Sequence, residues 1–336
     1  MDNWVRKKYS KKEVRRAGKA LAELESITPH QREVIGNWRA AHAFPLNSIQ
    51  NSLRHRARKI DKDAVIAQRL KRLPSIKSKL QRFPTMSLDR MQDIGGCRAV
   101  VNDLKLLYLL RDELTLVSGV KERNDYVVNG KNDTGYRGIH LISKYSGKRE
   151  EYSGFQSEIQ IRTKVQHAWA TAVEVIGSVT KQSLKTSQGD KDIIKYFKFV
   201  SDLFYEEEYS FYVGGIESRA NQIKRQEVRN LTRELRILEK LSLFNFIDNF
   251  IVENEDKVNH YLLCLDIVNK KLDVQIFSTK EVEKATAVYT DIEEKNQDLD
   301  VVLVSARSAN SIRKSYPNYF ANTELFRDFL LKATKS

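Results

Sequence analysis

The sequence predicts an α+β fold in which strands interspersed with helices are followed by a smaller α+β domain. Polar and apolar residues alternate at 155–163, and short apolar runs predict further strands near 97–102 and 137–145. Helical spacing dominates the rest, including a long charged stretch at 189–243. The composition changes after about residue 243, so we expect one domain at 1–243 and a second at 244–336.

In the first domain we expect helices at 10–26 and 30–43, with helical signal continuing to about residue 72. Pro74 suits the first turn of another helix, and helices are predicted at 103–117 and from 164 to 176. In the second domain, residues 261–277 predict a β-hairpin, 279–294 a helix and 300–306 a strand. A terminal helical segment is broken at Pro317.

The composition indicates a basic intracellular protein. The 336 residues carry a formal net charge of +14, which favours a polyanionic partner, although an ordinary basic protein is the simpler reading. The two cysteines, Cys97 and Cys264, are too few for a disulfide framework. The N-terminus is too charged for a secretory signal, and no apolar run has transmembrane length. We therefore expect a cytoplasmic protein with no membrane partner.

The segment EIQIRT at 158–163 has the pattern of a strand that lines a site. Glu158, Gln160 and Arg162 share one face of the strand, and Ile159 and Ile161 share the other. An amphipathic surface strand is the alternative interpretation.

A second carboxylate, Asp93, opens the segment DIGGCRAVV at 93–101, in which the apolar run at 99–101 marks a buried strand. Asp93 and Glu158 are hard oxygen ligands of the kind that Mg²⁺ uses together with substrate phosphates. Upstream, a predicted helix N-terminus is surrounded by polar and basic side chains, an arrangement typical of an anion site: Arg69, Lys71, Ser75 and Lys79. An ordinary solvated basic helix is the alternative.

Taken in order, these motifs resemble the synthetase domain of RelA/SpoT-type alarmone synthetases over about residues 45–180. The matching set is the four residues above, then D-I-G-G-x-R, G-Y-R-x-x-H and E-I-Q-I-R-T. The resemblance implies a mixed sheet flanked by helices. It also implies an enzyme that transfers the β,γ-pyrophosphate of ATP to an acceptor hydroxyl and releases AMP.

The resemblance also implies residue roles. Asp93 and Glu158 would be the catalytic and Mg²⁺-binding carboxylates, and Glu158 would help to deprotonate the attacking hydroxyl. The ATP-binding residues would be Arg69 and Arg123, which stack on adenine, and the phosphate contacts Lys71, Ser75, Lys79 and Arg98. The acceptor-binding residues would be Tyr136, which stacks on the acceptor base, with Arg137, His140 and Gln160.

Two departures from the family pattern weigh against GDP or GTP as the acceptor. Members that use guanosine nucleotides carry a basic residue four positions before the loop tyrosine, where this chain has Asn132. The acid–His pair that usually follows the final W-A is also missing, and Glu174 is the only charged residue in TAVEVIG.

The second domain contains Y-x-x-Y at Tyr316 and Tyr319, a weak pattern for which a packed aromatic pair is the default reading. The whole layout is similar to the CapRel type of fused toxin–antitoxin, in which a toxic small alarmone synthetase precedes a pseudo-zinc-finger domain. That resemblance implies transfer of pyrophosphate to the 3′ end of tRNA and arrest of translation. It further implies autoinhibition by the C-terminal domain until a phage protein, such as a capsid protein, is sensed.

In this hypothesis the two tyrosine rings fill the adenine slot between Arg69 and Arg123. The alternatives are a (p)ppGpp or (p)ppApp synthetase and, outside enzymes, an inactive RNA-binding module.

Overall fold

The computed structural model describes residues 4–180, 182, 184, 189–213, 219–242, 259–266, 269, 271–295, 299–306, 309–320 and 323–335. A five-stranded mixed sheet in the order β1-β2-β5-β4-β3 lies at its centre, with β2 parallel to β5 and the other neighbours antiparallel. The strands are β1 (Val65–Leu70), β2 (Gly95–Val101), β3 (Val120–Asp125), β4 (Ile139–Lys144) and β5 (Gln156–Thr163).

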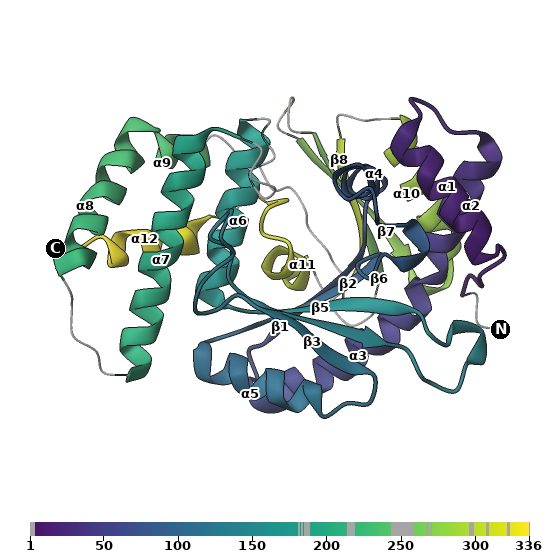
Figure 1. Cartoon of the computed structure of the whole chain (residues 1–336), viewed down its shortest axis with the longest axis horizontal. Helices are drawn as coiled ribbons and strands as arrows, with labels where there is room; N and C mark the ends of the chain where they lie inside the picture. Colours follow the sequence, from purple (N-terminus) through teal and green to yellow (C-terminus); the bar gives the residue numbers. More distant parts are fainter. Residues whose placement is uncertain are drawn as a thin grey trace.

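Helices lie around this sheet in two groups, and two more cover its lower face in Figure 1. The N-terminal group is α1 (Lys11–Glu23), α2 (Pro29–Ala41) and α4 (Leu73–Arg82). The other group is α6 (Lys164–Val179), α7 (Lys191–Val213), α8 (Arg219–Glu234) and α9 (Ile237–Ser242). The covering helices are α3 (Ala43–Ile60) and α5 (Leu104–Thr115).

Most predicted elements of this part are confirmed, and two strands were missed. The first two helices begin at capping boxes, in which Ser10 pairs with Glu13 and Thr28 pairs with Gln31. The expectation of helix up to residue 72 is wrong, because α3 ends at Ile60 and β1 follows. Strand β3 was not predicted.

The small sheet has the order β7-β6-β8 and is antiparallel throughout. It consists of β6 (Asn259–Asp266), β7 (Lys271–Ser278) and β8 (Leu299–Ala306), with α10 (Val282–Lys295) on one face. These elements confirm the predicted hairpin, helix and strand. The other face of the small sheet packs with Tyr316, Tyr319 and Ala67, and Ala67 belongs to β1 of the large sheet.

The chain ends in two separate helices, α11 (Ala309–Ser315) and α12 (Glu324–Ala333). Figure 1 shows α11 above the large sheet, and α12 crossing the group of helices that contains α6 and α7. Phe326, Leu330 and Ala333 of α12 are buried in the core formed by α6 and α7. The segment predicted as one domain at 244–336 therefore packs in two places, and its last helix joins the first part of the chain.

Candidate functional site

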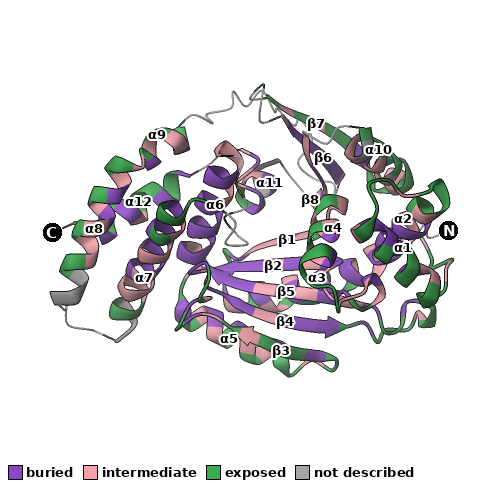
Figure 2. Ribbon diagram, turned by 45° about the horizontal axis from the view of Figure 1, so that its top comes forward, coloured by how far each residue is buried: buried purple, intermediate pink, exposed green. Residues whose placement is uncertain are grey.

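The site lies on the face of the large sheet that α3 and α5 leave uncovered. Cys97, Ile159 and Leu141 are buried in the core with these helices. Because strand side chains alternate, Arg98, Glu158, Gln160, Arg162 and His140 point to the opposite face. The strand register places His140 beside Gln160 and Arg98 beside Gln160 on its other side. The alternation expected for 158–162 is confirmed, and Figure 2 shows the mixed burial along β5.

Asp93 lies two residues before β2 and between two lysines. Its Oδ2 is 3.1 Å from Lys71 Nζ and 2.7 Å from Lys79 Nζ. Burial alone would raise the pKa of Asp93, but the two ammonium groups outweigh burial and hold it below its usual value. Burial also lowers the pKa of Lys71. The structure thus brings together Asp93, Lys71 and Lys79, three of the residues predicted to bind Mg²⁺ and ATP.

A different set of neighbours stabilises the ionised form of Glu158. Its Oε1 is 3.1 Å from His140 Nδ1, and its Oε2 accepts a hydrogen bond of 2.8 Å from Gln160 Nε2. Burial would raise the pKa of Glu158, but these contacts lower it to about 2. Burial opposes the charged form of His140 as well, yet Tyr136 and Glu158 raise its pKa to about 9.

The two carboxylates fit a magnesium ion that is shared with substrate phosphates. Asp93 Oδ1 is buried and has no hydrogen-bond partner among the described residues, which leaves one oxygen available to a cation. Glu158 also acts to raise the pKa of Asp93, as a nearby carboxylate does. Within the described ranges no group of three or more His, Cys, Asp or Glu could hold a metal. Magnesium bound with phosphates needs only one or two carboxylates.

The remaining predicted ATP-binding residues lie around Asp93. Arg69 is exposed on β1 opposite Gly96, and Ser75 lies half-buried in the first turn of α4. Arg123 belongs to β3 at the far edge of the sheet, but its Nη1 donates to Gln92 Oε1 (3.1 Å), next to Asp93.

Arg98 contacts the C-terminal part of the chain rather than an open pocket. Its Nη2 donates to the backbone oxygen of Ser315, at the end of α11. Its guanidinium carbon lies 6.0 Å from the centre of the Tyr316 ring, and the Tyr316 hydroxyl donates to the backbone oxygen of Gln68. Burial and neighbouring Arg162 lower the pKa of Arg98 to about 10.

Both motif tyrosines lie close enough to Arg69 for its charge to oppose the rise of their pKa that burial causes. Their expected position between Arg69 and Arg123 stays a prediction. Arg98 is the arginine that lies over Tyr316. The Tyr319 hydroxyl donates to the carboxylate of Asp300 within the tail. Both rings are buried in the cluster between the small sheet and β1, as the default reading of the motif had it.

A second contact between the two parts involves buried charges that no sequence pattern predicted. Arg39 of α2 donates to Glu293 Oε2 (2.9 Å) and to the Tyr289 hydroxyl (2.8 Å), both on α10. Glu293 Oε1 accepts from the backbone N–H of Leu73 (2.8 Å), the first residue of α4. A carboxylate of the C-terminal part thus occupies the N-terminus of the helix that was predicted to bind anions.

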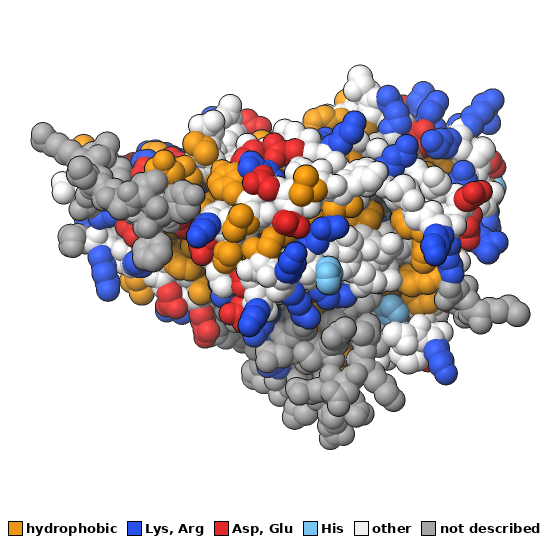
Figure 3. All heavy atoms as spheres, turned by 90° about the horizontal axis from the view of Figure 1, so that it is seen from below, with side chains coloured by type: hydrophobic (Ala, Val, Ile, Leu, Met, Phe, Trp, Pro, Cys, Tyr) orange, Lys and Arg blue, Asp and Glu red, His pale blue; other side chains and the backbone are white. Residues whose placement is uncertain are grey.

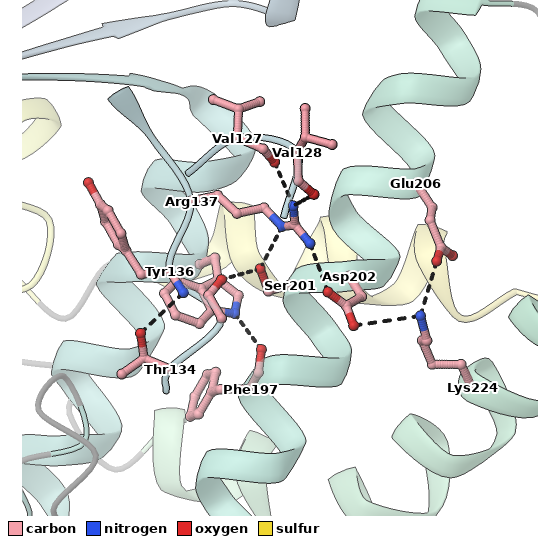
Figure 4. Close-up of polar contacts among 12 residues, drawn as sticks. Val127, Val128, Thr134, Tyr136, Arg137, Phe197, Ser201, Asp202, Glu206 and Lys224 are labelled. Carbon is pink, nitrogen blue, oxygen red and sulfur yellow. Dashed lines mark hydrogen bonds and ion pairs between the residues drawn. The ribbon is translucent and has the colours of Figure 1, made fainter. Parts of the chain in front are cut away.

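We call Tyr136, His140 and the polar residues of β5 the acceptor half of the site. Tyr136 and the next residue, Arg137, point in different directions (Figure 4). Arg137 is buried, and its guanidinium donates to Val127 O, Val128 O, Ser201 Oγ (3.0 Å) and Asp202 Oδ1 (2.7 Å). Because these partners belong to the loop before β4 and to α7, Arg137 ties the loop to that helix and points away from Tyr136. Tyr136, His140 and Gln160 remain together on the site face.

The distribution of charged side chains on the surface is less informative about a binding partner than these contacts are about the site. On the face drawn in Figure 3, Lys and Arg side chains are spread among acidic and apolar ones rather than gathered in one patch. In the part of the chain that the structure describes, no helix is long and apolar enough to span a bilayer.

Comparison with known families supports the sequence resemblance over part of the chain. Residues 68–176 match the family model described as "Region found in RelA / SpoT proteins". This range contains the second half of β1, α4 and the four later strands of the large sheet, and with them Asp93, Glu158 and the predicted acceptor-binding residues. Residues 68–176 are therefore similar to a region found in RelA/SpoT proteins. No curated protein sequence matches it.

Solved structures similar to this chain include three bacterial proteins. Small alarmone synthetase 1 from Bacillus subtilis, bound to its product pppGpp, is 22% identical with a TM-score of 0.43, covering 54% of this chain and 98% of its own. Small alarmone synthetase 2 from the same organism is 20% identical with a TM-score of 0.44, covering 52% and 95%. A GTP pyrophosphokinase family protein from Streptococcus pneumoniae is 20% identical with a TM-score of 0.44, covering 63% and 98%.

Proposed function

We propose that this chain is an anti-phage toxin–antitoxin fusion that transfers pyrophosphate from ATP to the 3′ end of tRNA. Its C-terminal part would hold the enzyme inactive until a phage protein binds. The observation that carries the enzymatic part is that Glu158 lies close enough to Asp93 to act on its pKa, within residues 68–176, and that Asp93 lies beside Lys71 and Lys79.

The residues of this face can perform the transfer by positioning and charge neutralisation. The acceptor oxygen bonds to the β-phosphorus of ATP, the bond from that phosphorus to the α–β bridging oxygen breaks, and AMP leaves. Lys71, Lys79 and Arg98 would hold phosphate oxygens, and Asp93 with Glu158 would hold Mg²⁺. When bound, Mg²⁺ would neutralise charge that develops on the transferred group. With a pKa of about 2, Glu158 is a weak base here, which favours its orienting and metal-binding roles.

Support for tRNA over a guanosine nucleotide comes from the acceptor loop. Asn132, exposed in this loop, stands where a basic residue would grip the acceptor's own phosphates. An acceptor that is the end of a nucleic-acid chain is bound over a wider surface and depends less on that single contact. The net charge of +14 favours such a polyanion.

Support for restraint comes from the contacts that the C-terminal part makes with the predicted donor residues. The backbone of Ser315 accepts from Arg98, and the small sheet packs on Ala67 of β1. Tethering in one chain gives these groups a high effective concentration. A phage protein that binds the tail only when it is open would shift the population towards active enzyme.

The test is incubation with γ-labelled ATP and either bulk tRNA or GDP and GTP, with and without chelation of Mg²⁺. It should be run on the full chain and on a variant with a weakened tail contact. We expect label on RNA in the variant, and loss of this label on chelation. Label on guanosine nucleotides alone would favour the alarmone synthetase. RNA binding without transfer to any acceptor would favour the inactive RNA-binding module.

A further inference from the structure

Five side chains of the acceptor half form a closed ring of hydrogen bonds and ion pairs. Three lie on alternate positions of β5, His140 lies beside them on β4, and Tyr136 comes from the preceding loop. Around the ring, Arg162 contacts Tyr136 and Gln160, Tyr136 contacts His140, and both His140 and Gln160 contact Glu158. Arg162, like Tyr136, lies two contacts along the ring from Glu158.

Arg162 can only donate hydrogen bonds, and Glu158 in its ionised form can only accept them. Arg162 Nη2 donates to Gln160 Oε1 (2.9 Å), and Gln160 Nε2 donates to Glu158 Oε2 (2.8 Å). Arg162 therefore fixes which way the Gln160 amide points. If the amide turned over, it would present its oxygen to the Glu158 carboxylate, and two acceptors would face each other.

Arg162 holds Tyr136 through a second set of contacts. Its Nε donates to the Tyr136 hydroxyl (3.1 Å), and its guanidinium carbon lies 4.9 Å from the centre of the Tyr136 ring. The side chain is 7% exposed, so these contacts are made largely out of water, where they are strongest. Its Nη1 is buried with no hydrogen-bond partner among the described residues, a cost that a purely structural arginine would be expected to avoid.

We propose that Arg162 is a positioning residue of the acceptor half, which sets the ring of Tyr136 and, through Gln160, the carboxylate of Glu158 at the same time. Only the catalytic part of this proposal, that Arg162 matters for transfer, rests on the proposed function. Its structural part, that Tyr136 and Gln160 take their orientation from Arg162, concerns the protein without any substrate.

The first experiment therefore needs no activity. The full chain is labelled with 3-fluorotyrosine, and the ¹⁹F resonance of Tyr136 is identified among those of the 14 tyrosines by its absence in Tyr136→Phe. In Arg162→Met, which keeps the aliphatic volume, we expect that resonance to shift or broaden while most others stay in place. Arg162→Lys, which retains the charge but not the planar fork, should give the same change if the Met variant does not fold. An unmoved Tyr136 resonance in a folded variant would overturn the proposal.

The second experiment measures transfer in a background with a released tail, such as Tyr316→Ala. Arg162→Lys should lower kcat/KM for the acceptor by about tenfold or more and leave the KM for ATP within about twofold. Combined with Gln160→Leu, the loss should be smaller than the product of the two single losses, because both act on Glu158 through one chain. The proposal would be contradicted if the two single losses in kcat/KM multiplied in the double variant, or if only the KM for ATP changed. No transfer by the released parent would count against the proposed function instead, and the ¹⁹F result would still stand.

Discussion

At the scale of single residues, the side chains that lie on strands could be predicted and those that depend on distant partners could not. The period of two along 158–162 was enough to place Glu158, Gln160 and Arg162 together. Arg137 follows the loop tyrosine directly, yet its partners Ser201 and Asp202 lie more than 60 positions away in sequence. No local pattern indicates such a pairing, so its inward direction could be found only in the folded chain.

The first prediction at this scale concerns Glu158. Glu158→Gln should abolish pyrophosphate transfer, because it removes the charge that faces His140 and the predicted Mg²⁺. The change is isosteric, and we expect the thermal midpoint to remain within a few degrees of the parent. Labelled-ATP transfer and thermal melting, both in the released background, check the prediction. Near-parental transfer in this variant would sink the assignment of Glu158.

The second prediction at this scale concerns His42 and the stability of the fold in acid. His42 is 2% exposed beside Trp38 and Phe155, and burial lowers its pKa from 6.5 to about 4. Between these two values the unfolded chain binds the proton and the folded chain does not, so stability falls as the pH falls from about 6.5 to 4. At about 1.4 kcal/mol per pKa unit the loss is roughly 3 kcal/mol.

Denaturant unfolding at pH 7 and pH 4.5 measures this loss. His42→Phe should flatten the difference between the two pH values, although it sacrifices the hydrogen bond from Nδ1 to the Trp38 carbonyl (2.8 Å). Some acid sensitivity should remain from His260, whose pKa burial also lowers. An undiminished pH dependence in a folded His42→Phe variant would show that His42 is not its source.

At the scale of elements, helices with caps were predicted well and the two edge strands of the large sheet were not. Strand β3 consists of VKERND and is mostly exposed, so it has neither an apolar run nor a buried face to reveal it. Strand β1 is VIAQRL, whose Ala67 is buried by the small sheet rather than by its own domain. Strand β1 pairs with β2, packs Ile66 and Leu70 on the core with α3, and has the C-terminal part on its other face.

A prediction at this scale concerns α12, which was expected to belong to the second domain. Phe326 is fully buried against Phe197 and Phe204, so Phe326→Ala should destabilise the helical group of α6 and α7 by about 3–5 kcal/mol. Leu331 on the same helix is 59% exposed, and Leu331→Ala is the matched control with little expected effect. Denaturant unfolding compares the two. Equal and small effects would mean that α12 contributes little to this core.

The same packing bears on how the C-terminal part should be removed in experiments. A truncation that deletes α12 along with the small sheet takes Phe326 and Leu330 out of the α6–α7 core. Loss of activity in such a truncation would therefore not show that the C-terminal part is needed for catalysis. Point substitutions in the contact between the two parts leave this core intact and give the cleaner comparison.

At the scale of the whole molecule, the two parts of the chain are joined through buried charge as well as through apolar packing. Arg39 and Glu293 are about 6% exposed each, and the sequence separation of 254 positions put their pairing beyond prediction. Arg72 pairs with Asp300 across the same boundary. The two tyrosines of the motif add apolar contact and one hydrogen bond to Gln68.

The last prediction uses this contact to test restraint. Glu293→Ala leaves Arg39 buried without its carboxylate in the closed arrangement, a loss of about 3–5 kcal/mol when one partner of a buried pair is removed. In an open arrangement Arg39 is hydrated and carries no such penalty. The substitution should therefore shift the chain towards the open form, because a change of this size is enough to move a two-state equilibrium substantially. We expect tighter binding of a fluorescent ATP analogue and higher basal transfer without any phage protein.

Two companion variants separate opening of the contact from unfolding of the tail. Tyr316→Phe keeps the ring and removes only the hydroxyl that reaches Gln68, so it should open the chain less than Tyr316→Ala does. Tyr319→Phe removes a hydroxyl that bonds Asp300 within the tail and should release the enzyme least. Thermal melting must show a folded tail in each. If Glu293→Ala and Tyr316→Ala both stay folded and ATP-analogue binding is unchanged in both, the tail does not restrain the donor site, since the charged and the aromatic contacts will each have been removed without effect.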